Sequence, residues 1–186
     1  MDYKSLTPMQ IDALKEVFNI GTGNSATALS TMLNQKIEIT VPNLRIIKLQ
    51  ELVEAQAETE VIGVLVKSMG EVTGNILYTF KINVAKNISN SLLATDDVFS
   101  EMGMSVMAEV GNIIASSFLN SIAVVTGLSM ISSVPATVHD MLSSILSYTV
   151  IEAEQYNDYV LEIETLFKGE DENNFKGSFS FIPKPG

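Results

Sequence analysis

The chain has 186 residues, yet it contains no cysteine and a single histidine, His139. Without cysteine, the sequence excludes disulfides, zinc fingers and cysteine nucleophiles. A serine-hydrolase triad is excluded as well unless His139 serves as its base. We interpret His139 as a surface or helix-start residue.

Basic residues are also scarce, with 11 Lys and Arg against 22 Asp and Glu and a formal net charge of −11. An acidic surface repels nucleic-acid backbones and anionic lipid head groups, so we expect neither as a partner. The start, MDYKSLTPMQ, has no basic segment followed by an apolar one, so no export signal is visible. We expect a cytoplasmic protein.

One stretch, residues 110–138, lacks charged residues and is long enough to cross a membrane. Polar residues such as Asn112 and Asn120 interrupt it, and Gly127 divides it into a helix and a strand. We therefore predict a helix buried inside a soluble domain, without membrane insertion.

The first helix has a clear start. Thr7 as N-cap, Pro8 at the first helical position and Gln10 form a capping box, and the apolar pattern continues to about Leu33. Strands are predicted at 36–42 (ended by Pro42), 43–50, 59–68 and 72–81. Helices follow at about 85–93 and 97–125, and further strands at 128–135, 148–154, 159–169 and 175–183.

The order of these elements recurs, because each long helix leads into a strand that ends in Val-Pro. Aligning DALKEVFNI with SVMAEVGNI without gaps pairs residues 93 positions apart: Glu16 with Glu109, Asn19 with Asn112, and Val41-Pro42 with Val134-Pro135. We predict a single domain over 1–186 with an internal repeat at about 7–81 and about 97–183.

Two glycines interrupt the first helix, Gly21 and Gly23. A phosphate-binding loop is not favoured, since no lysine follows them and the second copy has Ile114-Ala115-Ser116 in place of Gly21-Thr22-Gly23. We predict instead that the glycines let the two long helices cross closely near a pseudo-two-fold axis.

The polar residues of the aligned motifs lie on one face of each long predicted helix. At about 100° per residue, Asp12, Glu16 and Asn19 fall within a stripe of about 60°. Ser105, Glu109 and Asn112 form the same stripe on the second helix. The helix rises about 22 Å from Asn19 to its end and the strand returns about 20 Å, so we expect each proline near the level of its asparagine.

A carboxamide can hold a water molecule with one donor and one acceptor, while a carboxylate can pair with a cation. Together they can orient water at a phosphoryl group, as glutamine does in some nucleotide hydrolases. A single Glu-x-x-Asn would be interpreted as a solvated polar face. Two copies with 22 residues between asparagine and proline favour a functional site.

The pattern [Asp/Ser]-x3-Glu-x2-Asn-x22-Pro, present twice, resembles the CheC family of bacterial and archaeal chemotaxis phosphatases (the CheC/CheX/FliY group). The resemblance covers nearly the whole chain and is closest to the stand-alone, two-site members. It implies an α+β fold of two α-β-β-β halves, in two layers, with two long helices on a mostly antiparallel sheet. It also implies dephosphorylation of the response regulator CheY and, often, binding of the deamidase CheD.

The resemblance assigns roles to these residues. Asn19 and Asn112 would orient the attacking water, and Glu16 and Glu109 would pair with a lysine of the regulator. Asp12 and Ser105 occupy the variable first position, and Pro42 and Pro135 would be structural. The family implies no cofactor of its own, with Mg²⁺ held by the regulator, and we expect a monomer.

Two alternatives remain open. A non-catalytic adaptor would bind CheD or phosphorylated CheY and modulate signalling, and a duplicated structural domain would carry the polar stripes by coincidence. The retention of both glutamates and both asparagines favours the phosphatase. Because the surrounding residues differ, with Asp12 opposite Ser105 and Gly21 opposite Ile114, we expect the two sites to differ in activity.

Overall fold

The computed structural model describes residues 6–55, 58–152, 159–168 and 175–184. Its two longest helices are α1 (Pro8–Leu33) and α4 (Glu101–Thr126). The remaining elements are β1 (Glu38–Lys48), α2 (Leu49–Ala55), β2 (Glu60–Gly70), β3 (Gly74–Lys81), α3 (Ile82–Leu93), β4 (Met130–Ser132), β5 (Ala136–Met141), α5 (Leu142–Glu152), β6 (Tyr159–Lys168) and β7 (Phe175–Pro183).

Helix α1 begins and ends where its sequence predicts. The Thr7 hydroxyl accepts a hydrogen bond from the Gln10 backbone N–H at 3.3 Å, and Gln10 Oε1 accepts one from the Thr7 N–H at 2.8 Å. This capping box satisfies two N–H groups that the helix itself leaves unpaired. After Leu33, Asn34 takes the left-handed conformation (φ 49°) that closes the helix.

The seven strands form one sheet in the order β1-β6-β7-β3-β2-β4, with β5 also paired to β2. Every pair is antiparallel. Strand β1, which follows α1, pairs with β6, whereas β4 and β5, which follow α4, pair with β2. The chain segments after the two long helices therefore occupy opposite edges of the sheet, as a pseudo-two-fold arrangement requires.

Strand β1 differs from the prediction at Pro42. The strand continues through this proline to Lys48, and its register against β6 shifts between Thr40 and Asn43. Proline has no N–H to donate to a ladder, and a bulge is a place where none is needed. The prediction that Pro42 ends the strand was wrong. Pro135, the proline of the second motif, does lie in a break, between β4 and β5.

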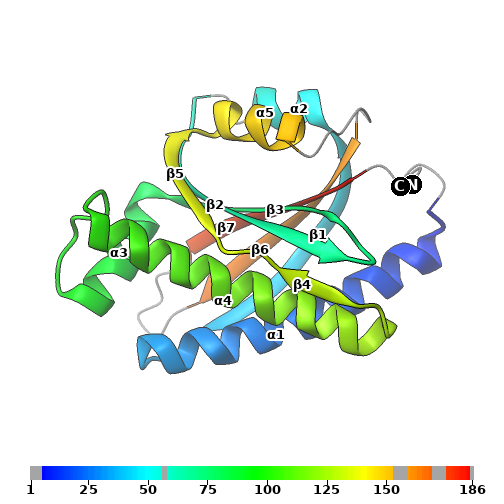
Figure 1. The fold of residues 1–186 in the computed structure, drawn as a ribbon, viewed down its shortest axis with the longest axis horizontal. Coiled ribbons are helices and arrows are strands. Elements are labelled where there is room, and N and C mark those ends of the chain that lie inside the picture. Colours follow the sequence, from blue (N-terminus) through cyan, green and yellow to red (C-terminus); the bar gives the residue numbers. More distant parts are fainter. Residues whose placement is uncertain (1–5, 56–57, 153–158, 169–174, 185–186) are drawn as a thin grey trace.

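Helices cover both faces of the sheet. Figure 1 shows α1 and α4 side by side across one face, and α2 and α5 over the other. The predicted α+β class, with two long helices on an antiparallel sheet, is confirmed. The expectation of two layers was wrong, because α2 and α5 form a third layer on the other face. Helices α2 and α5 were not predicted, and the strand expected from residue 148 was wrong, because these residues belong to α5. Leu142, Ile145, Leu146 and Thr149 follow a helical period and are buried.

The two long helices cross where Gly21 meets Phe118. A Cβ atom on Gly21 would lie 3.0 Å from Phe118 Cδ2, and Ser25 Oγ donates to the Ile114 carbonyl at 3.1 Å. The rings of Phe18 and Phe118 stack beside them with centroids 5.0 Å apart. Close helix packing is confirmed for Gly21. It was wrong for Gly23, which has no atom within 4 Å of the position its Cβ would take.

Helix α4 is the one helix of the described residues whose length and composition would let it cross a membrane. In the structure it packs against α1 and the sheet, and Phe118 and Leu119 are among its buried residues. Gly111 brings it close to β2, since a Cβ there would lie 2.4 Å from Val64 Cγ1. Gly127 ends the helix with a φ of 73°, as predicted.

Candidate functional site

The stripe on α1 faces solvent. Asp12, Glu16 and Asn19 are exposed, whereas Phe18 on the opposite face is 3% exposed. Within the described residues, the side chains of Glu16 and Asn19 form no hydrogen bond or ion pair. The backbone carbonyl of Asn19 does accept a bond from the Thr22 hydroxyl at 3.1 Å. Both functional groups of this stripe are therefore free to meet a partner.

The stripe on α4 is less exposed than the stripe on α1, and its asparagine forms a hydrogen bond. Ser105 and Glu109 are exposed, and Asn112 is half-buried. Asn112 Oδ1 accepts a hydrogen bond from Ser116 Oγ at 3.3 Å, and Ser116 Oγ lies 3.0 Å from Ser132 Oγ on β4. Neither serine was predicted as a site residue. The available signal was a serine one helical turn after the asparagine.

The structure describes Pro135 more fully than Pro42. Pro135 is half-buried and follows β4 by three residues. The hydrogen bond between Ser116 and Ser132 holds β4 against α4 close to Asn112. The backbone of Pro42 lies inside β1, and its side chain is outside the described residues.

The carboxylates of Glu16 and Glu109 have no counter-ion within the part of the chain that the structure describes. Four ion pairs occur among the described residues: Lys36 with Glu38, Arg45 with Glu162, Lys67 with Glu152, and His139 with Glu60. Glu16 and Glu109 take part in none of them. Within the described residues, both glutamates are therefore available to pair with a cation of another molecule.

His139 lies apart from both stripes. It is exposed on β5, its Nε2 is 2.7 Å from Glu60 Oε1, and its ring centroid is 4.5 Å from that of Phe99. It is a surface residue, as predicted, although on a strand and not at a helix start. Across the part of the chain that the structure describes, no three His, Asp or Glu residues gather closely enough to hold a metal ion.

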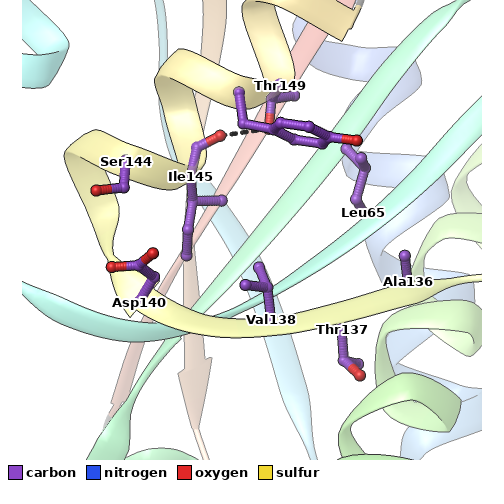
Figure 2. Close-up of a pocket in the computed structure, with 9 residues that line it drawn as sticks. Leu65, Ala136, Thr137, Val138, Asp140, Ser144, Ile145 and Thr149 are labelled. Carbon is purple, nitrogen blue, oxygen red and sulfur yellow. Dashed lines mark hydrogen bonds between the residues drawn. The ribbon is translucent and has the colours of Figure 1, made fainter.

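Two cavities are separate from the stripes. One, of about 320 Å³, lies between β5 and α5, and Figure 2 shows Val138, Asp140 and Thr149 around it. Its carboxylate, Asp140, accepts the backbone N–H of Met141 at 2.7 Å. The other, of about 480 Å³, is walled by apolar side chains of α1, α4 and the sheet. Glu16, Asn19, Glu109 and Asn112 line neither cavity.

The candidate site is therefore two exposed helix surfaces and not an enclosed pocket. A small substrate would be bound with little of its surface covered, whereas a folded partner could cover a helix face. Each face offers an anionic group and a neutral carboxamide three residues apart, which fall on the same side of a helix.

Comparison with known proteins agrees with this geometry. The sequence model of the CheC-like family matches residues 9–46 and again residues 102–139. The CheY-P phosphatase CheC of Bacillus subtilis (strain 168) is 28% identical over 190 residues, covering 97% of this chain and 91% of that protein. Over these segments the chain is similar to the CheC-like family.

Solved structures of the CheC/CheX/FliY group share its fold. Thermotoga maritima FliY matches with a TM-score of 0.82 and 22% identity, covering 96% of this CheC-like chain and 92% of the other. The CheX–CheY–BeF3–Mg²⁺ complex from Borrelia burgdorferi matches with a TM-score of 0.60 and 22% identity, covering 92% and 99%. Both family matches within this chain begin in the first turns of a long helix and contain one complete Glu-x-x-Asn stripe.

Proposed function

We propose that this CheC-like protein is a phosphatase that hydrolyses the aspartyl phosphate of a CheY-type response regulator. The observation that carries the proposal is the pair of exposed Glu-x-x-Asn stripes, whose carboxylates have no counter-ion among the described residues. The name of the B. subtilis relative supports CheY-P as substrate, and the CheX–CheY complex supports a protein of this fold as a CheY partner.

In the proposed reaction, Glu16 or Glu109 pairs with a lysine of the regulator when the proteins meet. The neighbouring asparagine, Asn19 or Asn112, enters the regulator's phosphorylation site and orients one water molecule. That water attacks phosphorus, the bond between phosphorus and the aspartate oxygen breaks, and the aspartate leaves as a carboxylate. Inorganic phosphate takes up the oxygen of the water, whose proton passes to phosphate or solvent.

The stripes supply only orientation and charge, so the phosphatase needs no cofactor of its own. We propose that Mg²⁺ is held by the regulator. When the water is held in line with the leaving group, it no longer has to reach that position by a random encounter. In this proposal, the carboxamide accelerates the reaction through this positioning. Asp12, Ser105, Pro42 and Pro135 have no part in this chemistry.

We also propose that the two stripes are copies within an internal repeat of about 7–81 and about 97–183 in one domain. The two family matches start 93 residues apart, at 9 and 102. The helix crossing supports the same offset, because the contact of Gly21 with Phe118 and that of Ser25 with Ile114 exchange when 93 is added or subtracted.

The family resemblance further supports CheD as a second partner, and we propose this interaction as well. Action on a response regulator implies a cytoplasmic protein, and two sites on one chain require no second copy, so we propose a monomer. A binding measurement with purified CheD tests the proposed interaction, and sedimentation of the free protein tests whether it is a monomer.

The decisive experiment compares two double variants. Asn19→Ala with Asn112→Ala should abolish phosphate release from the phosphorylated regulator while leaving its binding largely intact, because an oriented water matters most in the transition state. Glu16→Ala with Glu109→Ala should lose activity and also weaken binding, most visibly at low salt, where charge pairs are least screened.

The measurements are phosphate release and titration of the phosphorylated regulator against each variant. If the asparagine double variant still shortens the lifetime of the phosphorylated regulator as the parent does, the catalytic assignment is wrong. If the parent binds the phosphorylated regulator without shortening that lifetime, the protein is an adaptor.

A further inference from the structure

Ser116 donates its hydroxyl proton to a side chain, whereas most hydroxyl residues of the described helices donate to a backbone carbonyl. Nine helical serines and threonines donate to the backbone carbonyl four residues earlier: Ser25, Thr27, Ser30, Thr31, Ser91, Ser121, Thr126, Ser147 and Thr149. This is the usual bond of such residues inside a helix. Ser116 instead donates to the side chain of Asn112, at 3.3 Å.

A second hydroxyl completes the arrangement. Ser116 Oγ lies 3.0 Å from Ser132 Oγ, and either could be the donor. Each hydroxyl has one proton, and that of Ser116 is used on Asn112, so Ser132 donates to Ser116. Ser132 is itself fixed by β4, where it pairs with Ser68 of β2. The orientation of the Asn112 carboxamide is therefore tied, through two hydroxyls, to the sheet.

The first site cannot form this arrangement. Subtracting 93 from 116 and from 132 gives Gly23, which has no side chain, and Ile39, which is apolar and 8% exposed. Asn19 is exposed and has no side-chain hydrogen bond within the described residues. The two asparagines thus differ in how much rotational freedom they lose on meeting a substrate.

We propose that Ser116 and Ser132 are positioning residues that hold Asn112 in its working orientation, which makes the second site the faster of the two. The proposal rests on the phosphatase function proposed above. With Oδ1 held by Ser116, the Nδ2 donors and the second lone pair of Oδ1 remain for the water. Because the orientation exists before the regulator arrives, less entropy is lost in reaching the transition state.

The kinetic test separates the sites by single substitutions. Asn19→Ala leaves only the second site, and Asn112→Ala only the first, so kcat should be higher in the Asn19→Ala protein. Adding Ser116→Ala to Asn19→Ala should lower kcat about three- to tenfold, the size of one net hydrogen bond, without changing KM. Ser116→Thr, which keeps a hydroxyl, should restore most of the rate.

The matched control adds Ser116→Ala to Asn112→Ala. A serine that acts only through Asn112 has no effect there, whereas general damage to the fold would lower this activity too. Ser132→Ala should act like Ser116→Ala but less strongly, since it removes the second bond and not the first.

A measurement on the free protein needs no regulator. In NMR relaxation experiments, the side-chain NH₂ group of Asn112 should be more ordered than that of Asn19, and Ser116→Ala should lower its order to the level of Asn19. Unchanged order in Ser116→Ala, or unchanged kcat when it is added to Asn19→Ala, would overturn the positioning role. If the parent releases no phosphate at all, the proposed function fails, and the NMR result still decides whether the serines hold Asn112.

Discussion

Gly21 and Gly23 stand two residues apart in α1, yet only Gly21 faces another helix. Its Cβ position is 3.0 Å from the Phe118 side chain and 3.3 Å from the Phe118 Cα atom. The second contact is with backbone, which cannot rotate away as a side chain can. At Gly23 the helix surface is open, so the glycine only adds backbone freedom to the unfolded chain.

We expect Gly21→Leu to lower the free energy of unfolding by about 1–3 kcal/mol through overpacking. The same substitution at Gly23 should be neutral or stabilising by about 0.5–1 kcal/mol, because leucine favours a helix more than glycine does. Urea denaturation of both variants gives the comparison. Equal destabilisation would show that the crossing does not depend on Gly21.

Among the contacts between helices and strands, a polar cluster connects α5 to the sheet. Glu152 at the end of α5 pairs with Lys67 of β2 and accepts a hydrogen bond from the Asn75 side chain of β3. Asn75, which is 1% exposed, also donates to the Thr149 carbonyl at 3.2 Å. The hydrogen bond from Lys67 is the largest of the effects that hold the pKa of Glu152 below its ordinary value.

The lowered pKa of Glu152 determines whether the free energy of unfolding rises or falls with pH. The folded state binds this proton more weakly than the unfolded state, so the stabilisation is complete above the ordinary carboxyl pKa and is lost as pH falls through the lowered one. Glu152→Gln should reduce the free energy of unfolding by about 1 kcal/mol at pH 7. The difference from the parent should shrink in acid.

Chemical denaturation at a series of pH values between neutral and acid measures this difference. Glu38→Gln is the control, since Glu38 pairs with Lys36 across solvent-exposed side chains and little change is expected. A difference between parent and Glu152→Gln that stays constant down to strong acid would contradict the role assigned to the charge.

At the scale of the whole molecule, the two sites share a fold but no residue. Glu16 and Asn19 lie on α1, and Glu109 and Asn112 lie on α4. No hydrogen bond or ion pair among the described residues joins one stripe to the other. The helices pack through their opposite faces, where Phe18 stacks on Phe118.

Independent sites should contribute additively. At low regulator concentration, the dephosphorylation rate of Asn19→Ala plus that of Asn112→Ala should equal the rate of the parent, with the larger share from the site that contains Asn112. The measurement is phosphate release at equal protein concentrations. A single variant that loses all activity would show instead that the sites work as one unit.

The local and periodic features of this protein follow from short stretches of its amino-acid sequence. The capping box of Thr7 and Gln10 needs only residues three apart, and the stripes follow from the helical period. The spacing of the two motifs in the sequence is sufficient to indicate the resemblance to the CheC family. A strand or a helix with a strong period is predicted well because the information lies within a few residues.

Features that depend on residues far apart in the chain are visible only in the folded molecule. Whether Gly21 or Gly23 packs depends on Phe118, nearly a hundred residues later, and whether Pro42 ends a strand depends on the register with β6. Helices α2 and α5 cover the second, apolar face of the sheet, and that this face needs covering is visible only once the strands are paired. The bond from Ser132 through Ser116 to Asn112 belongs to the same class, since it joins a strand to a helix and exists only once α4 lies against β4.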